Sequence, residues 1–146
     1  MKVVFTTDIA VEPVTLTEVK EALKITGSAA DDELERMITD ARIYVEKAID
    51  TSVTTRTIQV TSLEKLEEWE LPYGPTADLV LTYGTNWEDV LTYIYTYTGG
   101  VTTCPDEITR LITDYIKYKY DIDDEAIALP NSIKSQIQLL TRQPGL

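Results

Sequence analysis

Residues 31–50 carry the pattern that most limits how this chain can fold. Apolar residues recur there at every third or fourth position, namely Leu34, Met37, Ile38, Ala41, Val45, Ala48 and Ile49. This spacing places one apolar stripe along roughly five turns of helix. The opposite face is expected to carry Glu35, Arg36, Asp40, Arg42, Glu46 and Lys47. Acids and bases are mixed on that face, so the pattern predicts a helix that packs on a core, not a membrane helix.

Three further segments have helix signals. Thr15 and Glu18 have the spacing of a capping box, which predicts a helix over about residues 16–25. Pro105 suits the first turn of a helix, and acids follow it while lysines come near residue 120, which predicts a helix over about 105–120. A last short helix is expected from residue 131 onward.

The middle of the chain changes to threonine and β-branched residues. Period-two alternation predicts strands over about 53–61, 78–83 and 90–98, and a short strand is expected at residues 2–6. On one face of the third strand lie three tyrosines: Tyr93, Tyr95 and Tyr97. They cover a core or form a subunit interface, and the sequence leaves both alternatives open.

The order of these elements predicts an α+β fold that is mainly helical. We expect a helical bundle with a small inserted antiparallel β element and a C-terminal helical tail. Residues 1–130 would form the core domain, and residues 131–146 would form a tail that is separable after Pro130. No run of about 18 apolar residues occurs, so no membrane span is expected.

The chain has few residues that are candidates for catalysis. The chain has no histidine and one cysteine, which excludes Ser-His-Asp and Cys-His arrangements and a cysteine-rich zinc site. Among 25 acids, some pair meets any required carboxylate separation by chance. We therefore expect no enzyme, no cofactor and no metal. Cys104 precedes a helix start, where a thiol can be activated, but a small structural residue is the favoured interpretation.

The charge is strongly acidic and unevenly spread. The net charge is −12, which disfavours general binding to nucleic acid. One cluster lies after the third helix and consists of Asp121, Asp123, Asp124 and Glu125. It lacks the glycine and the final glutamate of a calcium loop. The cluster gives solubility, or it forms a lining that repels passing DNA or a rim that meets a basic partner.

The sequence resembles the head–tail connector (adaptor) family of tailed bacteriophages. Residues 12–25 are similar to the family's opening "P-V-T-L-x-E-x-K-x-x-L-x-I" helix, and residues 31–49 to its "D-x-x-L-x-x-x-I-x-x-A-R-x-Y-V-E" helix. Trp69-Glu70-Leu71-Pro72 resembles the "L-P" that precedes a strand pair in the family. Residues 105–118 resemble the family's late helix. Residues 129–142 resemble the "L-P" turn and the closing "L-L-x-x-R" tail that follow that helix. The middle strands match only in type.

This resemblance implies a structural virion protein without enzymatic activity. It implies a ring of copies, a dodecamer by resemblance, that docks on the portal protein and extends the channel through which DNA passes as cargo. It also implies a platform for tail or stopper proteins at the capsid–tail neck, in a protein made in the host cytoplasm. The tail either docks into a portal groove as a helix or packs on the chain's own core, and docking is the preferred alternative. The residues expected to dock are Ile133, Lys134, Ile137, Leu140 and Arg142.

A second class of function competes with this one. A soluble acidic inhibitor that mimics DNA would also carry a large negative charge. Its carboxylates should be evenly spaced like phosphates, whereas the acids here are clumped. An inhibitor would also leave the apolar face of the C-terminal segment unexplained. The connector is therefore the preferred prediction.

Overall fold

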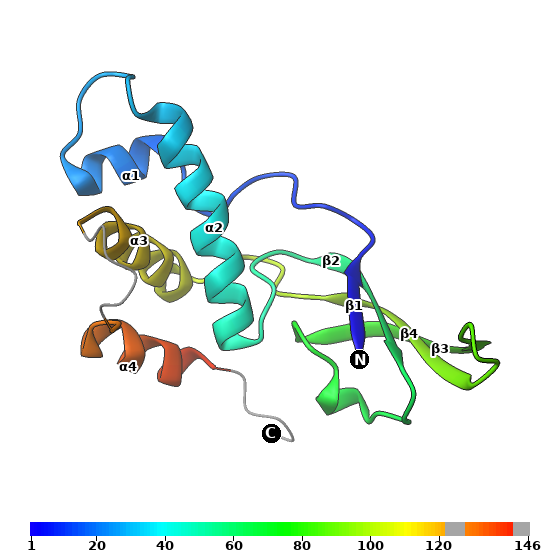
Figure 1. The fold of residues 1–146 in the computed structure, drawn as a ribbon. Helices are drawn as coiled ribbons and strands as arrows, with labels where there is room; N and C mark the ends of the chain where they lie inside the picture. Colours follow the sequence, from blue (N-terminus) through cyan, green and yellow to red (C-terminus); the bar gives the residue numbers. More distant parts are fainter. Residues whose placement is uncertain (122–127, 142–146) are drawn as a thin grey trace. The chain divides into compact units, whose positions relative to one another are not determined.

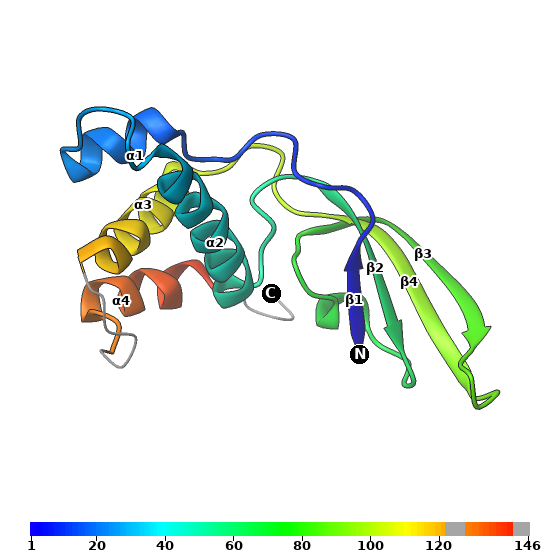
Figure 2. The ribbon, with the colours of Figure 1, turned by 45° about the horizontal axis from the view of Figure 1, so that its top comes forward.

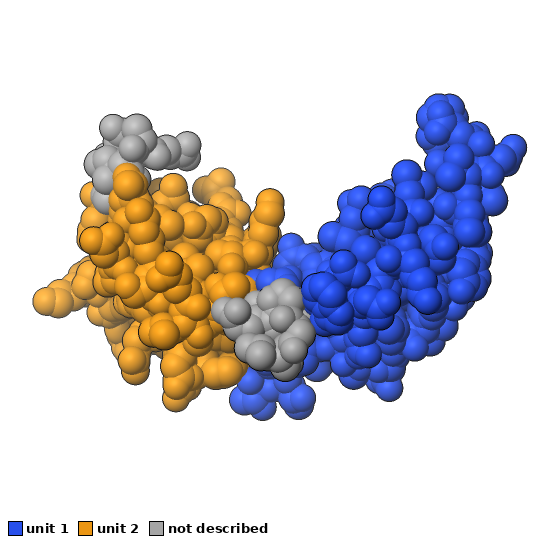
Figure 3. Space-filling view, turned by 90° about the horizontal axis from the view of Figure 1, so that it is seen from below, with its two compact units in different colours: residues 1–10, 50–103, 142–146 blue, residues 11–49, 104–141 orange. Residues whose placement is uncertain are grey.

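The computed structural model describes residues 1–121 and 128–141. The chain divides into two compact units, which Figure 3 shows in blue and orange. Unit 1 consists of residues 1–10, 50–103 and 142–146, and unit 2 consists of residues 11–49 and 104–141. Each unit is therefore assembled from segments that are far apart in the sequence.

Unit 2 is helical (Figure 1). It contains α1 (Leu16–Leu23), α2 (Asp31–Ile49), α3 (Asp106–Asp121) and α4 (Asn131–Leu140). Helix α2 contacts the other three helices, and α3 contacts α1 and α4. The predicted stripe of α2 supplies the fully covered side chains Leu34, Val45 and Ile49. The hydroxyl of Thr15 accepts a hydrogen bond from the Glu18 N–H and so caps α1 as its spacing predicted.

Unit 1 is a four-stranded sheet (Figure 2). Its strands are β1 (Lys2–Phe5), β2 (Arg56–Ser62), β3 (Thr76–Thr85) and β4 (Leu91–Gly99), in the order β1-β2-β4-β3. All three pairings are antiparallel. A single 3-10 turn, η1 (Glu68–Glu70), lies in the connection from β2 to β3. The guanidinium of Arg56 lies 4.0 Å from the ring centre of Phe5, which adds a cation–π contact between β2 and β1.

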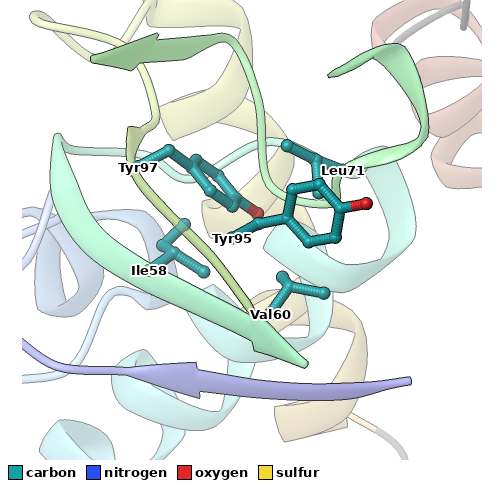
Figure 4. Packing of buried hydrophobic residues seen from close by; sticks show 5 residues of the cluster. All are labelled: Ile58, Val60, Leu71, Tyr95 and Tyr97. Atoms are coloured by element: carbon teal, nitrogen blue, oxygen red, sulfur yellow. The ribbon is translucent and has the colours of Figure 1, made fainter. Parts of the chain in front are cut away.

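The sheet carries its own apolar core (Figure 4). This cluster consists of Ile58, Val60, Leu71, Tyr95 and Tyr97, none of them more than 2% exposed. Its tyrosine hydroxyls are satisfied at its border, since Tyr97 donates to the Pro72 carbonyl at 2.6 Å and Tyr95 donates to the Leu66 carbonyl at 3.2 Å. A buried aromatic ring can thus remain in the core without leaving its polar end unpaired.

The expected fold class is wrong in its central point. Helices account for 41% and strands for 24% of the described residues, so the protein is not mainly a helical bundle with a small inserted β element. The sheet is larger than the sequence suggested because β1 joins it by pairing with β2, more than fifty positions later. A connecting segment also adds Leu71 to the sheet's core. The β part is therefore a compact unit of its own.

The prediction of which α2 residues face solvent is also wrong at two positions. Arg42 is 5% exposed and Glu46 is 2% exposed, although both were assigned to the solvent side. They are tolerated in the interior because they neutralise each other across one helical turn. The remaining charged residues of that face, such as Glu35 and Lys47, are exposed as expected.

Candidate interaction surfaces

A buried network of three charged side chains ties the segment before α1 to α2. Arg42 Nη1 lies 2.7 Å from Glu46 Oε1, and Arg42 Nε lies 2.8 Å from Glu12 Oε2. The hydroxyl of Thr39 donates to the other oxygen of Glu12 at 3.2 Å. Desolvation by burial alone would lower the pKa of Arg42, but the two carboxylates outweigh it and the pKa is raised. Arg42 and Glu46 coincide with motif positions of the family resemblance, so this part of the motif serves the packing of unit 2.

Cys104 is not an activated thiol. Burial raises its pKa to about 11, and the nearby charges of Glu46 and Asp106 act in the same direction. Because the thiolate is the reactive form, a raised pKa suppresses reactivity. The interpretation of Cys104 as a small residue at a helix start is supported.

We expect Cys104 to react slowly with iodoacetamide at pH 8. With a pKa of about 11 instead of 9.0, its thiolate fraction there is roughly one hundredth of that of an ordinary thiol. The alkylation rate should rise continuously up to about pH 11, with glutathione as the reference. A rate that levels off below pH 9 would contradict the burial of this thiol.

The residues predicted to dock lie on α4 in unit 2. Ile133 is 2% exposed, because α4 packs on α2 and α3. The side-chain amide of Gln136 donates to Asp114 Oδ2 at 3.0 Å and fastens α4 to α3. Ile137 and Leu140 are half-buried, and Lys134 is exposed. Arg142 lies outside the described residues. The expected boundary after residue 130 therefore falls within unit 2.

The exposed side of α4 carries an apolar residue that the sequence reasoning did not single out. Leu139 is 85% exposed. It lies away from the positions Ile133, Ile137 and Leu140, which were expected to form one apolar face. Ile133, Ile137 and Leu140 are spaced by four and three residues, as expected for one face of a helix, and Leu139 does not fit this spacing. Helical periodicity alone therefore could not identify it.

The three tyrosines of β4 have different environments. Tyr95 and Tyr97 belong to the core cluster, which supports the core alternative for both. Tyr93 is half-buried and makes an edge-to-face contact with Tyr83, with ring centres 5.7 Å apart. Only Tyr93 therefore remains available to a partner in this conformation. Of the acidic cluster, Asp121 is exposed at the end of α3, while Asp123, Asp124 and Glu125 lie outside the described residues.

The hairpin formed by β3 and β4 exposes apolar side chains at its far end. The exposed fractions are 64% for Tyr83, 89% for Trp87 and 49% for Leu91. This surface was not predicted from the sequence. One sequence feature does mark the region of the hairpin: no lysine or arginine occurs between Lys65 and Arg110. Grouped aromatic and apolar side chains without lysine are typical of a surface that is covered by another protein.

Metal or membrane sites do not emerge from the described residues. Within residues 1–121 and 128–141, no group of three histidine, cysteine, aspartate or glutamate side chains is placed to hold a metal ion. In the same residues, no helix has the length and apolar content needed to cross a membrane. The surfaces that remain as candidates are the exposed side of α4, the end of the β3–β4 hairpin, and the sheet edges.

Comparison with known families decides the class of protein. Residues 13–71 match the model of the phage gp6-like head-tail connector protein family. Over these residues the chain is similar to the gp6-like head–tail connector family. The match spans α1, α2, β2 and η1, and it includes the Arg42–Glu46 pair. This match supports the family resemblance and the structural head–tail connector role that the sequence predicted.

Solved structures resemble the chain over its full length. One is described as the neck of an empty GTA particle computed with C6 symmetry, with a TM-score of 0.73 and 13% identity. Another is the virion of a native gene transfer agent particle, with a TM-score of 0.68 and 13% identity. Both matches cover 100% of this chain and 98% of the other chain. No curated protein sequence matches. At this identity the likeness shows a shared fold.

Proposed function

We propose that this connector is a structural, non-enzymatic ring subunit of a virion neck, synthesised in the host cytoplasm and assembled on the portal protein. The ring extends the DNA channel and presents a platform for tail or stopper proteins. The observation that carries this proposal is the family match over residues 13–71. The full-length likeness to a neck structure supports the extension to both units.

Closed symmetry is the natural form for such an assembly. A subunit whose two sides are different but complementary forms a ring when the rotation between neighbours closes. The related neck was computed with C6 symmetry, which is compatible with the twelve copies implied by the family resemblance. An acidic subunit with a net charge of −12 also suits a channel wall that does not retain DNA.

Residues 131–146 form the docking segment in this proposal. Lys134 and Leu139 are already exposed on α4 and offer a charge and an apolar contact to the portal. Docking through Ile133, Ile137 and Leu140 requires α4 to leave α2 and α3. The contacts of α4 in the isolated chain are then exchanged for contacts with the portal.

The decisive experiment is a cryo-electron microscopy reconstruction of the purified chain mixed with its cognate portal. We expect a closed ring beneath the portal, with residues 131–146 in contact with it. Folded monomers that remain separate from the portal at high concentration would contradict the proposal.

A point variant tests the docking segment without disturbing its packing. Leu139→Asp should weaken portal binding at least about tenfold, since a carboxylate cannot enter an apolar groove without loss of affinity. The helix itself should remain folded because Leu139 is 85% exposed. Co-elution with portal and circular dichroism measure the two effects. Deleting residues 131–146 is less informative, because it also removes the buried Ile133.

Gln138→Asp is the matched control for this variant. Gln138 is exposed on the same helix and already polar, so the added charge should leave portal binding close to that of the unmodified chain. If Leu139→Asp and Gln138→Asp bind portal equally well, the exposed side of α4 is not a docking surface.

A further inference from the structure

The sheet of unit 1 ends on both sides in strands that have one partner each. Among residues 1–121 and 128–141, strand β3 pairs only with β4, and β1 pairs only with β2. In Figure 2 these two strands form the opposite borders of the sheet. A border strand presents a row of backbone groups that can pair with another strand.

The second half of the β3 edge lacks the charges and prolines by which proteins often protect such a border. After the irregularity between Ala77 and Val80, the regular part of the strand is Val80-Leu81-Thr82-Tyr83-Gly84-Thr85. This segment contains no charge and no proline, and Val80 and Tyr83 are 55% and 64% exposed. Long exposed edges of this kind aggregate unless they are covered in the functional assembly.

The strand directions make a second copy of this chain a fitting partner. Each strand is antiparallel to its neighbour, so β1 and β4 run in one direction and β2 and β3 in the other. A copy placed beside β3 in the same orientation therefore presents its β1 antiparallel to β3. The alternation of the sheet continues unbroken from one copy to the next.

We propose that the β3 edge of one copy pairs with the β1 edge of the next, so that neighbouring sheets join into one continuous antiparallel sheet around the ring. This inference rests on the proposed ring and names the contact that builds it. The contact is heterologous, since it joins two different edges, and such contacts generate rings instead of isolated dimers.

The side chains of the two edges agree with this pairing. Directly paired residues lie on the same face of a sheet, and the rows Val4–Gln59–Thr96–Val80 and Lys2–Thr61–Ile94–Thr82 run across all four strands. Val4 and Val80 are exposed at opposite ends of one row. In the register that places Val4 opposite Val80 of the neighbouring copy, these two exposed apolar side chains cover one another.

Charge favours one register over its neighbour. A shift of two residues keeps every side chain on its face, so Val4 can lie opposite Val80 or Thr82. The second register places Lys2 opposite Gly84, closer to the hairpin turn that carries Glu88 and Asp89. Lys2 is the basic residue of β1, whereas β3 and the turn carry acidic residues and no basic residue. The register that brings Lys2 closer to Glu88 and Asp89 is therefore favoured by charge.

Cysteine cross-linking tests the contact directly. In a Cys104→Ser background, the double variants Val4→Cys/Val80→Cys and Val4→Cys/Thr82→Cys bracket the two registers. Neighbouring strands bring such positions within disulfide distance. After oxidation at concentrations where electron micrographs show rings, at least one double variant should give a ladder of covalent multimers on a non-reducing gel. Single-cysteine variants should remain monomeric.

Each contrary outcome has a separate meaning. Rings on the grid with only monomers on the gel would overturn the edge pairing and leave the proposed function intact. Dimers formed by Val80→Cys or Thr82→Cys alone would show β3 pairing with β3, which also overturns it. Absence of rings, with and without portal, would remove the proposed ring and this contact together.

A charge variant gives an independent readout. Val80→Lys places a charge on the β3 edge, which opposes pairing with another strand, and it brings a second base near Lys2 of the neighbouring copy. The fraction of protein assembled into rings, measured by light scattering, should therefore fall. Gln59→Lys lies in the same row on an inner strand and should leave the ring fraction unchanged. Equal ring fractions for both variants would contradict the pairing.

Discussion

A chain carrying Val45→Asp is expected to lose the folded structure of unit 2. Val45 is 0% exposed in the last two turns of α2, and a carboxylate there would be removed from water without a partner built to receive it. Such burial costs several kcal/mol, a large share of the roughly 5–15 kcal/mol that stabilises a typical domain. The far-UV circular dichroism signal of helix should fall at 25 °C, and the remaining transition should shift to much lower temperature.

The neighbouring variant Ile43→Asp provides the control. Ile43 lies two positions earlier on α2 and is 51% exposed, so the same new carboxylate remains in water. Its melting temperature should stay close to that of the unmodified chain. If Val45→Asp melts at the same temperature as Ile43→Asp, the assignment of the buried face of α2 is wrong.

Arg42→Met should be the second most damaging change. It leaves Glu46, which is 2% exposed, without the guanidinium that lies 2.7 Å away. Removing one partner of a buried ion pair costs about 3–5 kcal/mol, because the other charge remains desolvated. Denaturant unfolding followed by circular dichroism should show this loss in the free energy of unfolding.

Two companion variants separate charge from packing. Arg36→Met replaces an exposed arginine on the same helix and should change the free energy of unfolding by less than about 0.5 kcal/mol. Arg42→Met/Glu46→Leu removes both charges of the buried pair and should recover most of the stability lost in Arg42→Met. A double variant as unstable as the single variant would mean that the pair is needed for its geometry, not for its charge balance.

The helices were predictable because their signals are local. The stripe of α2 and the cap at Thr15 depend on residues within a few positions of each other, and both appear in the structure. The burial of Arg42 was not predictable in the same way. Its second partner, Glu12, comes thirty positions earlier, and a charged side chain by itself indicates solvent. Only the fold reveals that these charges neutralise each other.

The sheet was underestimated for a related reason. Strand positions were approximately correct, but the strength of a sheet depends on pairing across the sequence. Lys2–Phe5 pairs with β2, and Leu71 packs against Tyr97 from a connecting segment. Alternation within a single strand contains no information about either contact. The mainly helical prediction follows from counting local signals alone.

The candidate surfaces show the same limit. The tyrosines of β4 were candidates for a subunit interface because tyrosine is enriched at interfaces. Tyr95 and Tyr97 are instead buried in the core of the sheet. The β3 edge and Leu139 were missed because exposure of an apolar residue depends on what packs beside it. The absence of bases between Lys65 and Arg110 was the one signal in the sequence that pointed toward the hairpin.

The interleaved path of the chain has a consequence for its synthesis on the ribosome. Residues 11–49 leave the ribosome early, but their partner helix α3 ends at Asp121. At about 5–20 residues per second, the apolar stripe of α2 waits for several seconds while the whole sheet is translated. A message truncated after residue 103 would yield the four strands of the sheet attached to α1 and α2, which would lack α3 and α4. Nascent chains of this protein should therefore recruit holding chaperones before α3 emerges, and release them once it has been made.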